Sequence, residues 1–430
     1  MAAAFDLIVV GGGTAGSVVA ARCAGAGRRV LLLEAGPAPE PGDRAAALAG
    51  PSFHAALAVP GRAWRLDVAR SAGGPPVPYL CGRGLGGGSS VNAMLADHAD
   101  GLPIELHAAA PGERGALSRA LLDAAPGAGL DVEPALLTRD AQGHRHSVVE
   151  AYVDPAVRDD GLVVSGDTLV DRVLLDRHGM VTGVRVADGR EIGAPCVVIA
   201  AGALHSPGIL LRSGINRPGV GSGLQDHPSI TLPVQLRKGE PSTVVPVSVV
   251  CRGTARVAGD IRMMPVDQTD PTDARRAGLL AAVMHVESRG AVRLVDDDPH
   301  TPPRVEFASL SHPDDVAALR TAIDLARRFA DTEAFEAVGE LCDVDVSVEA
   351  LRAAVGGIYH PTSTCRMGRP DDPLAVVDAE CRVIGAEGLF VCDASVFPRV
   401  PMANPNLPVI RLAERVAAIV RATTTGTARE

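Results

Sequence analysis

Residues 5–34, FDLIVVGGGTAGSVVAARCAGAGRRVLLLE, decide the fold of this chain. The first six residues are rich in aliphatic and β-branched side chains and predict a strand. The glycine loop of residues 11–16 follows, residues 17–23 predict a helix, and residues 29–33 predict a second buried strand that ends at Glu34. A strand, a GxGxxG loop, a helix, a strand and an acidic residue in this order are typical of a βαβ unit that binds a dinucleotide.

The three glycines of this loop have separate predicted roles. Gly11 makes the tight turn, Gly13 removes the Cβ that would keep a pyrophosphate away, and Gly16 lets the helix pack closely on the strand. The helix N-terminus offers unpaired N–H groups and the positive end of its dipole to phosphates. Glu34 lies 18 residues after Gly16, where it is placed to accept hydrogen bonds from a ribose. The alternative is a strand–turn–helix unit that binds nothing.

Composition describes a soluble globular protein with room for two domains or one elaborated domain. Of its 430 residues, 47% are apolar and 21% are charged. The net charge of −10 leaves no basic footprint for nucleic acid. Eight scattered cysteines without a CxxC pair argue against a zinc site and a disulfide framework, so no metal is expected.

The sequence contains no predicted targeting or membrane segment. The first strand begins at Phe5, which leaves no room for a signal peptide. No apolar run approaches the ~20 residues that a membrane span needs. We therefore expect a cytoplasmic protein without a membrane span.

A second glycine-rich segment, GRGLGGGSSVNAM, covers residues 82–94. Such a segment lets the backbone pass close to a flat or charged ligand, and Ser89, Ser90 and Asn92 add hydrogen-bonding groups. The alternative is a flexible linker, against which Leu85 and Val91 stand as apolar anchors.

The middle of the chain predicts a second domain. Four β-rich runs alternate with turn clusters, at residues 230–236, 243–250, 279–286 and 291–294. This pattern predicts an antiparallel sheet, and residues 316–330 predict a long amphipathic helix. Residues 36–78, rich in Pro, Gly and Ala, predict loops with short helices. The expected division is a dinucleotide-binding domain of residues 1–229 with 368–430, and a substrate domain of residues 230–367.

The C-terminal region is the second informative part of the sequence. An irregular segment, YHPTSTCRMG, covers residues 359–368, and the predicted strand of residues 389–391 leads to Cys392–Ser395. The segment MANPNLP, residues 402–408, opens a last helix that runs to Val420. Small and polar residues at the end of a strand are expected where a sheet meets a cofactor.

Together these segments resemble the glucose–methanol–choline (GMC) family of FAD-dependent oxidoreductases. The matching blocks are the first glycine loop, residues 82–92, residues 202–214, the LQDHP segment at 224–228, and residues 360–406. The resemblance implies an α/β protein: a Rossmann-like FAD-binding domain with a second, reduced antiparallel-sheet (α+β) substrate domain.

The same resemblance implies the cofactor contacts. Val91 stands where some family members carry the histidine that links to FAD, which implies non-covalent FAD. The remaining implied contacts are Gly11, Gly13, Thr14, Ala15, Gly16 and Glu34 to the ADP half, Val170 to the adenine, Arg83, Gly87, Ser89, Asn92 and Ala93 along the pyrophosphate and flavin, Asp393 and Ala394 to the pyrophosphate and ribityl region, and Asn404 and Pro405 beside the flavin ring.

His360 and Asn406 match the family's two catalytic positions. A histidine, with an unperturbed pKa near 6.5, suits the base that takes the hydroxyl proton of an alcohol. An asparagine donates a hydrogen bond to the substrate oxygen without competing as a base. The implied reaction is oxidation of an alcohol to a carbonyl, with hydride transfer to flavin N5. His205, His227 and the pair at 144 and 146 are expected to be structural.

The chain is shorter than typical family members, and the losses fall between Met94 and Gly143 and within residues 230–290. These regions build much of the family's cap, so a more exposed site and a bulky or peptide-derived alcohol are expected. The short dehydrogenases associated with mycofactocin are similar in this respect. A hydroxynitrile lyase and a non-catalytic FAD-binding protein remain alternatives. The electron acceptor, whether oxygen, a quinone or a carrier protein, stays open, with a dehydrogenase preferred over an oxidase.

Overall fold

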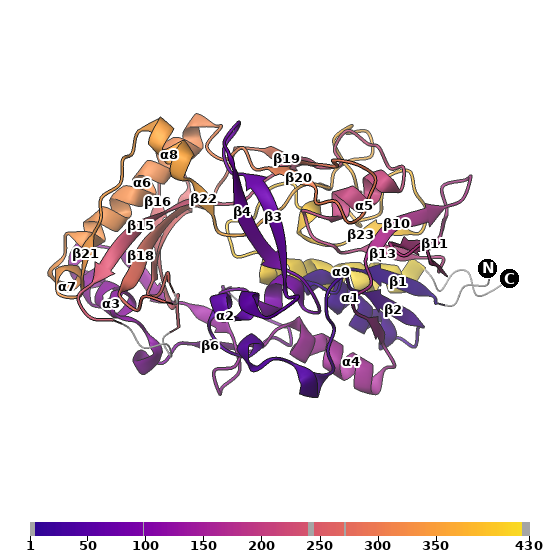
Figure 1. Ribbon diagram of the computed structural model, residues 1–430, viewed down its shortest axis with the longest axis horizontal. Coiled ribbons are helices and arrows are strands. Elements are labelled where there is room, and N and C mark those ends of the chain that lie inside the picture. The colour runs from indigo at the N-terminus through magenta and orange to yellow at the C-terminus, as the bar shows by residue number, and fades with distance from the viewer. Residues whose placement is uncertain (1–4, 98, 240–244, 271, 424–430) are drawn as a thin grey trace.

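The protein is described here by a computed structural model covering residues 5–97, 99–239, 245–270 and 272–423. A parallel sheet of five strands forms the core of the first domain, on the right of Figure 1. Every neighbouring pair in it is parallel. Its order is β23 (Leu389–Val391), β13 (Val197–Ile199), β1 (Leu7–Val10), β2 (Val30–Leu33) and β9 (Val163–Ser165). The four strands other than β9 are wholly buried, as strands covered on both faces require.

Close backbone contact fixes the first βαβ unit. Helix α1 (Thr14–Ala24) follows β1 and packs against the last helix, α9 (Asn406–Thr423). A Cβ on Gly11 would lie 2.5 Å from the carbonyl oxygen of Ala200, and Gly11 adopts a positive φ of 101°. A Cβ on Gly16 would lie 1.9 Å from the carbonyl oxygen of Gly11. The predicted roles of both glycines are therefore confirmed: only glycine permits the turn and the helix–strand approach.

A large antiparallel sheet forms the second domain, on the left of Figure 1. Its strands in spatial order are β21 (Gly339–Leu341), β15 (Pro228–Leu236), β18 (Arg276–Val283), β17 (Ala258–Val266), β16 (Val249–Thr254) and β7 (Asp131–Pro134), with β22 (Gly356–Gly357) also paired to β15. Helices α3 (Ala116–Ala128) and α6 (Pro313–Ala330) pack on it. Ile261 and Met263 face these helices, whereas Met264 and Val266 belong to a separate cluster on the opposite face.

Helix α6 shows how local sequence docks an element on this sheet. Pro313 occupies its first turn, and the imidazole of His312 accepts the N–H of Asp314. The buried carboxylate of Asp315 accepts the N–H groups of Glu287 and Ser288, at 3.0 and 2.8 Å. The helix therefore begins at a fixed point beside β18, and its apolar face lies on the sheet.

The remaining elements complete three small sheets and the connections. The described helices and turns are α2 (Phe53–Ala58), α4 (Asp154–Asp159), α5 (Ser206–Arg212), α7 (Glu333–Glu336), α8 (Val348–Ala354), the 3₁₀ turns η1 (Pro41–Asp43), η2 (Ala46–Leu48), η3 (Gly87–Ser90), η4 (Pro111–Glu113) and η6 (Ala394–Val396), and the π turn η5 (Val149–Val153). The strands are β10 (Val170–Leu175), β11 (Val181–Val186) and β12 (Glu191–Gly193) in one sheet, β5 (Leu95–Ala96), β8 (Leu136–Thr138) and β6 (Leu106–Ala108) in a second, and β14 (Ser222–Leu224), β19 (Gly290–Arg293), β20 (Arg304–Glu306), β3 (Ala63–Ala69) and β4 (Pro76–Gly82) in a third.

Two expectations differ from the structure. Residues 36–78, expected as loops with short helices, include strand β3 and the first part of β4. Leu66 and Val68 are buried on β3 while Arg65 and Asp67 are exposed, and the strand pairs with β20 far along the chain. Its main partner is the neighbouring strand β4, which pairs along its whole length, whereas β20 pairs only with Val68 and Ala69. The Pro, Gly and Ala content of residues 36–78 hid this hairpin from the sequence pattern. The expected strand at 243–250 begins as β16 only at Val249, and residues 243 and 244 lie outside the described residues.

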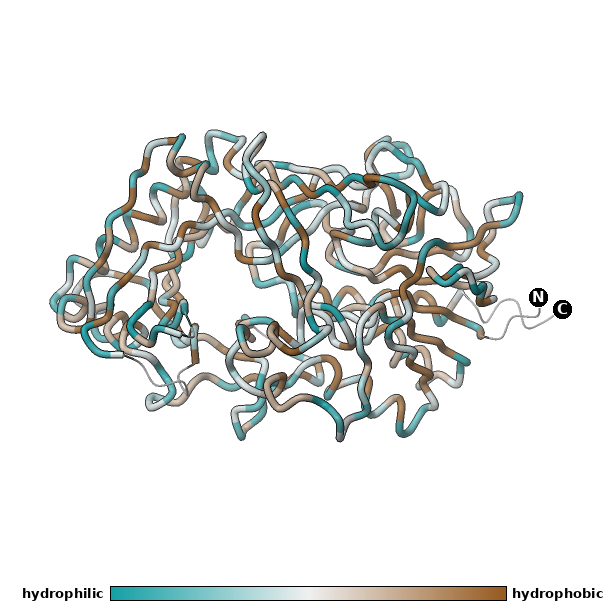
Figure 2. The backbone as a smooth tube through the Cα atoms, in the orientation of Figure 1, coloured by the Kyte–Doolittle hydropathy of each residue, from teal (hydrophilic) through white to brown (hydrophobic). Residues whose placement is uncertain are grey.

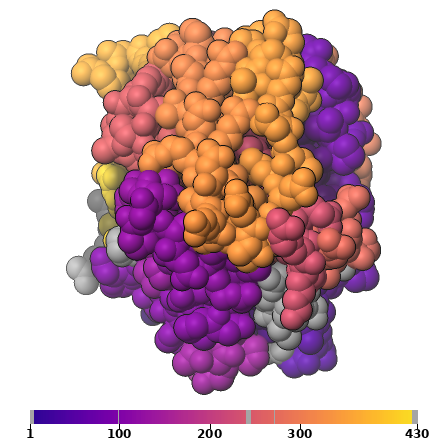
Figure 3. All heavy atoms as spheres, turned by 90° about the vertical axis from the view of Figure 1, so that its left-hand side faces the viewer, coloured from indigo at the N-terminus to yellow at the C-terminus, as the bar shows by residue number. Residues whose placement is uncertain are grey.

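The segment of α3 and β7 packs with the second sheet. Strand β7 pairs with β16, and α3 contacts α6 and α7. In Figure 3 the purple atoms of this part of the chain flank the orange atoms of α6–α8. Residues 116–134 fall within the expected first domain, 1–229. In the structure they pack on the antiparallel sheet of the second domain. Figure 2 shows hydrophobic segments along the strands of both sheets.

Gly16→Ala should destabilise the fold, whereas Gly13→Ala should cost only the difference between glycine and alanine as the N-cap of α1, about 1 kcal/mol or less. Alanine gains about 1 kcal/mol of helix propensity over glycine. At position 16, however, its Cβ meets a backbone oxygen at 1.9 Å, and such overpacking costs about 1–3 kcal/mol or more. No atom lies within 4 Å of a Cβ on Gly13. Urea denaturation of FAD-free protein measures both, and an unchanged midpoint for Gly16→Ala would contradict the proposed contact.

Candidate active site

Two glycine loops from distant parts of the sequence meet and form an open backbone surface. The N–H of Gly86 donates to the carbonyl of Gly12 at 2.7 Å. A Cβ on Gly87 would lie 2.8 Å from the Cα of Gly13, so the two loops are in contact there. The other side of Gly13 is open, since nothing lies within 4 Å of the Cβ that it lacks. This opening is the space that the sequence analysis assigns to a pyrophosphate.

Glu34 joins these loops. Its carboxylate is only 6% exposed and accepts the N–H groups of Gly12, Gly36 and Gly84, at 2.7, 2.8 and 2.9 Å. A carboxylate offers about four acceptor sites, so capacity remains for a ribose hydroxyl. Glu34 thus has a structural role that the sequence analysis missed, in addition to the ribose contact expected from the motif.

The N-termini of two helices converge beside the open glycine. Thr14 begins α1 and Asn406 begins α9, and the Thr14 hydroxyl donates to Oδ1 of Asn406 at 3.2 Å. With Oδ1 assigned as this acceptor, the amide Nδ2 of Asn406 keeps its donors for another group. Both helix termini carry unpaired N–H groups and positive dipole ends, which favour an anionic ligand.

The other predicted contact residues are held mostly by the protein itself. Asp393 accepts from the N–H of Gly202, the hydroxyl of Ser206 and the N–H of Ser395, at 2.9, 2.6 and 2.8 Å. It therefore connects the ends of β13 and β23. The side chain of Arg83 donates to the carbonyl of Ala35, and the hydroxyl of Ser89 donates to the carbonyl of Gly86. Oδ1 of Asn92 accepts from the Met94 N–H and from the guanidinium of Arg145. Val170 is buried in β10, Ala394 begins η6, and Ala93, Asn404 and Pro405 are half-buried.

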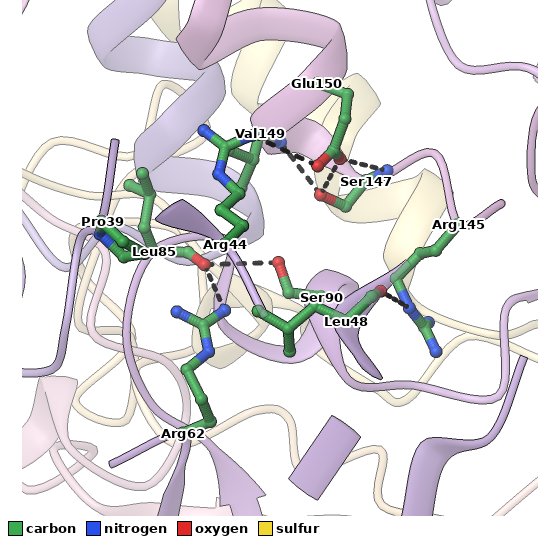
Figure 4. A pocket seen from close by; sticks show the side chains of 10 residues that line it. All are labelled: Pro39, Arg44, Leu48, Arg62, Leu85, Ser90, Arg145, Ser147, Val149 and Glu150. Carbon is green, nitrogen blue, oxygen red and sulfur yellow. Dashed lines mark hydrogen bonds and ion pairs between the residues drawn. The ribbon is translucent and has the colours of Figure 1, made fainter. Parts of the chain in front are cut away.

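A small cavity lies behind the second glycine loop (Figure 4). The carbonyl of Leu85 accepts from the Arg62 guanidinium at 2.6 Å and from the Ser90 hydroxyl at 3.3 Å. Its volume of about 20 Å³ holds about one water molecule. The cavity belongs to the support of the loop and is too small for a substrate.

His227 and His360 form a pair. Their Nδ1 atoms lie 2.9 Å apart, and Nε2 of His227 lies 3.0 Å from the carbonyl oxygen of Pro401. No described residue hydrogen-bonds to Nε2 of the partly exposed His360. His227, which was expected to be structural, contacts the predicted base with its ring. The signal was the LQDHP segment at 224–228, which the sequence analysis used only as a family landmark.

The hydrogen-bond chain assigns the protons of this pair. A carbonyl only accepts, so Nε2 of His227 carries the proton that bonds to Pro401. Burial lowers the pKa of His227 to about 3, so the ring is neutral and its Nδ1 has no proton. The proton between the two rings therefore belongs to Nδ1 of His360. In neutral His360, Nε2 is then an unprotonated acceptor, as a general base requires.

A buried ion pair sets the backbone of both histidines. Oδ1 of Asp226 accepts the N–H groups of His227 and His360, each at 2.8 Å, and its Oδ2 lies 3.2 Å from Nη1 of Arg70. The Arg70 guanidinium lies 4.9 Å from the ring centres of Tyr79 and Phe307. Burial raises the pKa of Asp226, an effect that Arg70 and the N–H bonds oppose. One oxygen thus aligns two chain segments that are distant in sequence.

Comparison with known proteins identifies this arrangement. Profiles described as GMC oxidoreductase match residues 104–229 and 286–413, and one for an NAD(P)-binding Rossmann-like domain matches residues 9–46. A 5-(hydroxymethyl)furfural oxidase of Methylovorus sp. (strain MP688) is 31% identical, over 96% of this chain and 98% of that protein. This chain belongs to the GMC oxidoreductase family.

The similarity to other GMC oxidoreductases covers the whole fold. The mitochondrial choline dehydrogenase of Homo sapiens is 29% identical, over 97% of this chain and 90% of that protein. The solved structure of pyridoxine 4-oxidase from Mesorbium loti has a TM-score of 0.86 at 25% identity, over 96% of this chain and 98% of that one. The predicted fold class, a Rossmann-like domain with an antiparallel-sheet domain, is confirmed.

GMC oxidoreductases are FAD flavoproteins. The two glycine loops, residues 11–16 and 82–88, together with Glu34 form a glycine cradle that fits this cofactor. The opening beside Gly13, the two helix N-termini and the remaining acceptor capacity of Glu34 suit a pyrophosphate and a ribose. Among the described residues, no cluster of His, Cys, Asp or Glu has the arrangement of a metal site. No helix in the described part of the chain is long and apolar enough to cross a membrane.

Gly13→Val should remove FAD without unfolding the protein. The valine Cβ meets no protein atom within 4 Å, but the side chain fills the space that the pyrophosphate needs. We expect the flavin content of purified protein to fall about tenfold or more, while the FAD-free protein stays folded and loses only the stability of a changed N-cap, about 1 kcal/mol. Gly112→Val is the matched control, because its Cβ also meets no atom within 4 Å and it lies outside the cradle. Full flavin content in Gly13→Val would show that the cofactor lies elsewhere.

Proposed function

We propose that this chain oxidises a primary alcohol to a carbonyl, with non-covalent FAD as the acceptor and His360 as the general base. The observation that carries the proposal is the proton order of the histidine pair, which leaves Nε2 of His360 as an acceptor. The relatives support the substrate class, because 5-(hydroxymethyl)furfural, choline and pyridoxine are all primary alcohols.

His360 takes the hydroxyl proton at Nε2. Bound FAD would supply the acceptor for the hydride that leaves the carbon bearing this hydroxyl. As His360 becomes positively charged, its Nδ1–H continues to donate to the neutral ring of His227. His227 in turn stays fixed by Pro401, and Asp226 holds both backbones, so little reorganisation accompanies the proton transfer.

Asn406 stabilises the substrate oxygen as its charge develops. Because its Oδ1 accepts from Thr14, its amide N–H group is directed to donate elsewhere. The first turn of α9 adds unpaired N–H groups and a positive dipole end near the same oxygen. Asn406 thus lowers the cost of the developing negative charge and does not remove the proton.

FAD is proposed to be non-covalent, because Val91 has an aliphatic side chain with no atom that forms a linkage to flavin. Denaturation of the yellow protein should therefore release all of its FAD into the filtrate. Flavin that stays on the precipitated chain would contradict this part of the proposal.

His360→Ala should slow flavin reduction by roughly 10²–10⁴-fold, the usual effect of removing a general base. FAD should stay bound, because the glycine cradle and Glu34 lie in other segments. Asn406→Ala should also slow reduction but keep the wild-type pH dependence, since it removes a donor and not the base. Anaerobic stopped-flow bleaching with a primary alcohol measures these rates. An unchanged rate in His360→Ala would show that another residue is the base.

The pH profile should lack the usual histidine step. Burial lowers the pKa of His360 well below 6.5, and the positive charge of Arg262 lowers it further. Only the neutral ring accepts a proton, so the bleaching rate should be constant above pH 6.5 and fall only in more acidic buffer. A rate that rises through an apparent pKa at or above 6.5 would contradict this proton assignment.

Two further outcomes separate the alternatives. A hydroxynitrile lyase would keep its flavin oxidised when mixed anaerobically with alcohols, whereas the proposed enzyme bleaches. We propose a dehydrogenase, with a quinone or carrier protein as acceptor, so reoxidation by a quinone should be faster than reoxidation by oxygen in the stopped-flow experiment. The peptide-derived substrate and the link to mycofactocin stay predictions.

A further inference from the structure

The Pro401 carbonyl, which orders the protons of the histidine pair, lies in a segment without regular structure. Residues 398–404 lie between η6 and α9 and belong to no helix or strand. Among the described residues, none forms a backbone–backbone hydrogen bond with residues 398–404. The position of this carbonyl therefore depends on the side chains that bond to the segment and on the packing of the segment's own side chains.

Gln225 provides a buried contact to this segment. It is 1% exposed, and its Oε1 accepts the N–H of Val400 at 3.1 Å. Its Nε2 donates to the carbonyls of Val286 and Ser288, at 2.9 and 3.2 Å. An N–H must meet an acceptor and a carbonyl must meet a donor, so these partners fix which end of the amide is oxygen. The side chain therefore has one orientation, with its oxygen toward Val400.

The groups that hold Gln225 are themselves held in place. The N–H of Ser288 donates to the carboxylate of Asp315 at 2.8 Å, in the first turn of α6. The backbone of Gln225 pairs with Thr362, by an N–H to carbonyl bond of 3.2 Å in one direction and 2.9 Å in the other. Thr362 follows His360 by two residues. Gln225 thus holds the chain on both sides of the histidine pair, one side through its side chain and the other through its main chain.

The other polar side chains that bond to this segment hold it at different points. Arg289 donates to the carbonyl of Pro398 at 3.2 Å in an exposed hydrogen bond, and Arg262 donates to the carbonyl of Met402 at 3.1 Å. The side chain of Arg399 forms an ion pair in a partly exposed position. Only the Gln225 amide bonds to the residue directly before Pro401.

The bond to Val400 restricts the Pro401 carbonyl. Proline has no N–H, so the N–H of Val400 is the last backbone donor before this carbonyl along the chain. The pyrrolidine ring also keeps the φ of Pro401 at about −65°. With Val400 held by Gln225, few rotations remain that would move the carbonyl away from Nε2 of His227, which lies 3.0 Å from it.

We propose that Gln225 is a positioning residue for the histidine pair: its amide fixes the Pro401 carbonyl, and this carbonyl sets the proton order that leaves Nε2 of His360 unprotonated. The inference rests on the proposed function for the use of that nitrogen as the base. Among the described residues, the Gln225 side chain has no hydrogen bond to either ring, so its effect passes through Pro401. When the carbonyl is free to move, the reversed order becomes similar in free energy, and His360 then carries its proton on Nε2.

Nitrogen NMR of the histidine rings tests the proton order directly. The holoenzyme is labelled with ¹⁵N-histidine, and His227→Gln and His360→Gln assign the two rings. Protonated and unprotonated ring nitrogens have well separated shifts. In the wild type we expect protons on Nε2 of His227 and Nδ1 of His360, favoured about tenfold or more over the reversed order, the scale of leaving the Pro401 carbonyl without its donor. Gln225→Met, which has a similar length and no amide, should bring the two orders to within about threefold of each other.

Two further variants separate positioning from loss of stability. Gln225→Glu is buried and therefore protonated, so it keeps an acceptor for Val400 and one O–H donor, and it should restore most of the wild-type order. Arg139→Met is the matched control, because Arg139 is also buried, at 5% exposed, and donates to a carbonyl in another segment, that of Ala108 at 2.8 Å. It should lower the urea midpoint and keep the wild-type order.

Three NMR results would overturn the proposal. These are a wild-type order in Gln225→Met, a disturbed order in Arg139→Met, or a loss in Gln225→Glu as large as in Gln225→Met. Urea midpoints and flavin content show which variants fold. If Gln225→Met does not fold, Gln225→Asn takes its place, since its amide is one methylene shorter and does not reach Val400 from the same backbone position.

Flavin bleaching distinguishes this inference from the proposed function. With a primary alcohol, the limiting rate of Gln225→Met should fall in proportion to the fraction of His360 with unprotonated Nε2, about twofold, while the alcohol concentration for half-maximal rate stays constant. If no alcohol bleaches the wild type but Gln225→Met still loses the proton order, the proposed function fails and the positioning role stands. If the wild type bleaches and Gln225→Met keeps both the order and the rate, only the role of Gln225 is rejected.

Discussion

The nucleotide-binding half of this protein depends on backbone contacts that leave no room for a side chain. Gly16 approaches the carbonyl of Gly11 so closely that a Cβ would lie at 1.9 Å, and Gly87 meets Gly13 in the same way at 2.8 Å. The first contact holds α1 on β1, and the second holds the loop of residues 82–94 on the first glycine loop. Glu34 then accepts N–H groups from both loops. The cradle is therefore built from backbone atoms, and its close contacts are possible because glycine has no Cβ.

The histidine pair shows how one carbonyl orders the proposed reaction centre. Pro401 can only accept, which sets the proton of His227, and the neutral ring of His227 then sets the proton of His360. Without this chain, each ring would have two tautomers of similar energy, and Nε2 of His360 would be unprotonated only part of the time. The buried surroundings keep both rings neutral, because a low dielectric disfavours their charged forms.

This chain is shorter than the relatives it matches, and it has the same overall fold. The alignment with the 5-(hydroxymethyl)furfural oxidase extends over 534 positions, whereas this chain has 430 residues, so the relative carries stretches that are absent here. Strand β7 and helix α3, which lie between Met94 and Gly143, close the edge and one face of the second sheet. That sheet carries Arg262 to the segment before Asn404.

The sequence by itself determined the first βαβ unit, because each of its signals is local: a buried run, glycines at fixed spacing, and a helix within 34 residues. It also determined α6 and α9, whose apolar periodicity and starting residues are local too, and it placed His360 and Asn406 as the matches to the family's catalytic positions. The hairpin of β3 and β4 was missed although its pairing is local, because Pro, Gly and Ala dominate residues 36–78, and only the tertiary structure adds β20 beside Val68 and Ala69. The surroundings of His360 were equally hidden. His227, Pro401 and Arg262 come from three separate segments, and only His227, in the LQDHP segment, stood in a recognised motif. Only the tertiary structure decided these contacts, because a hydrogen bond of about 3 Å across the chain depends on how sheets and loops pack, and sequence periodicity carries no information about that distance.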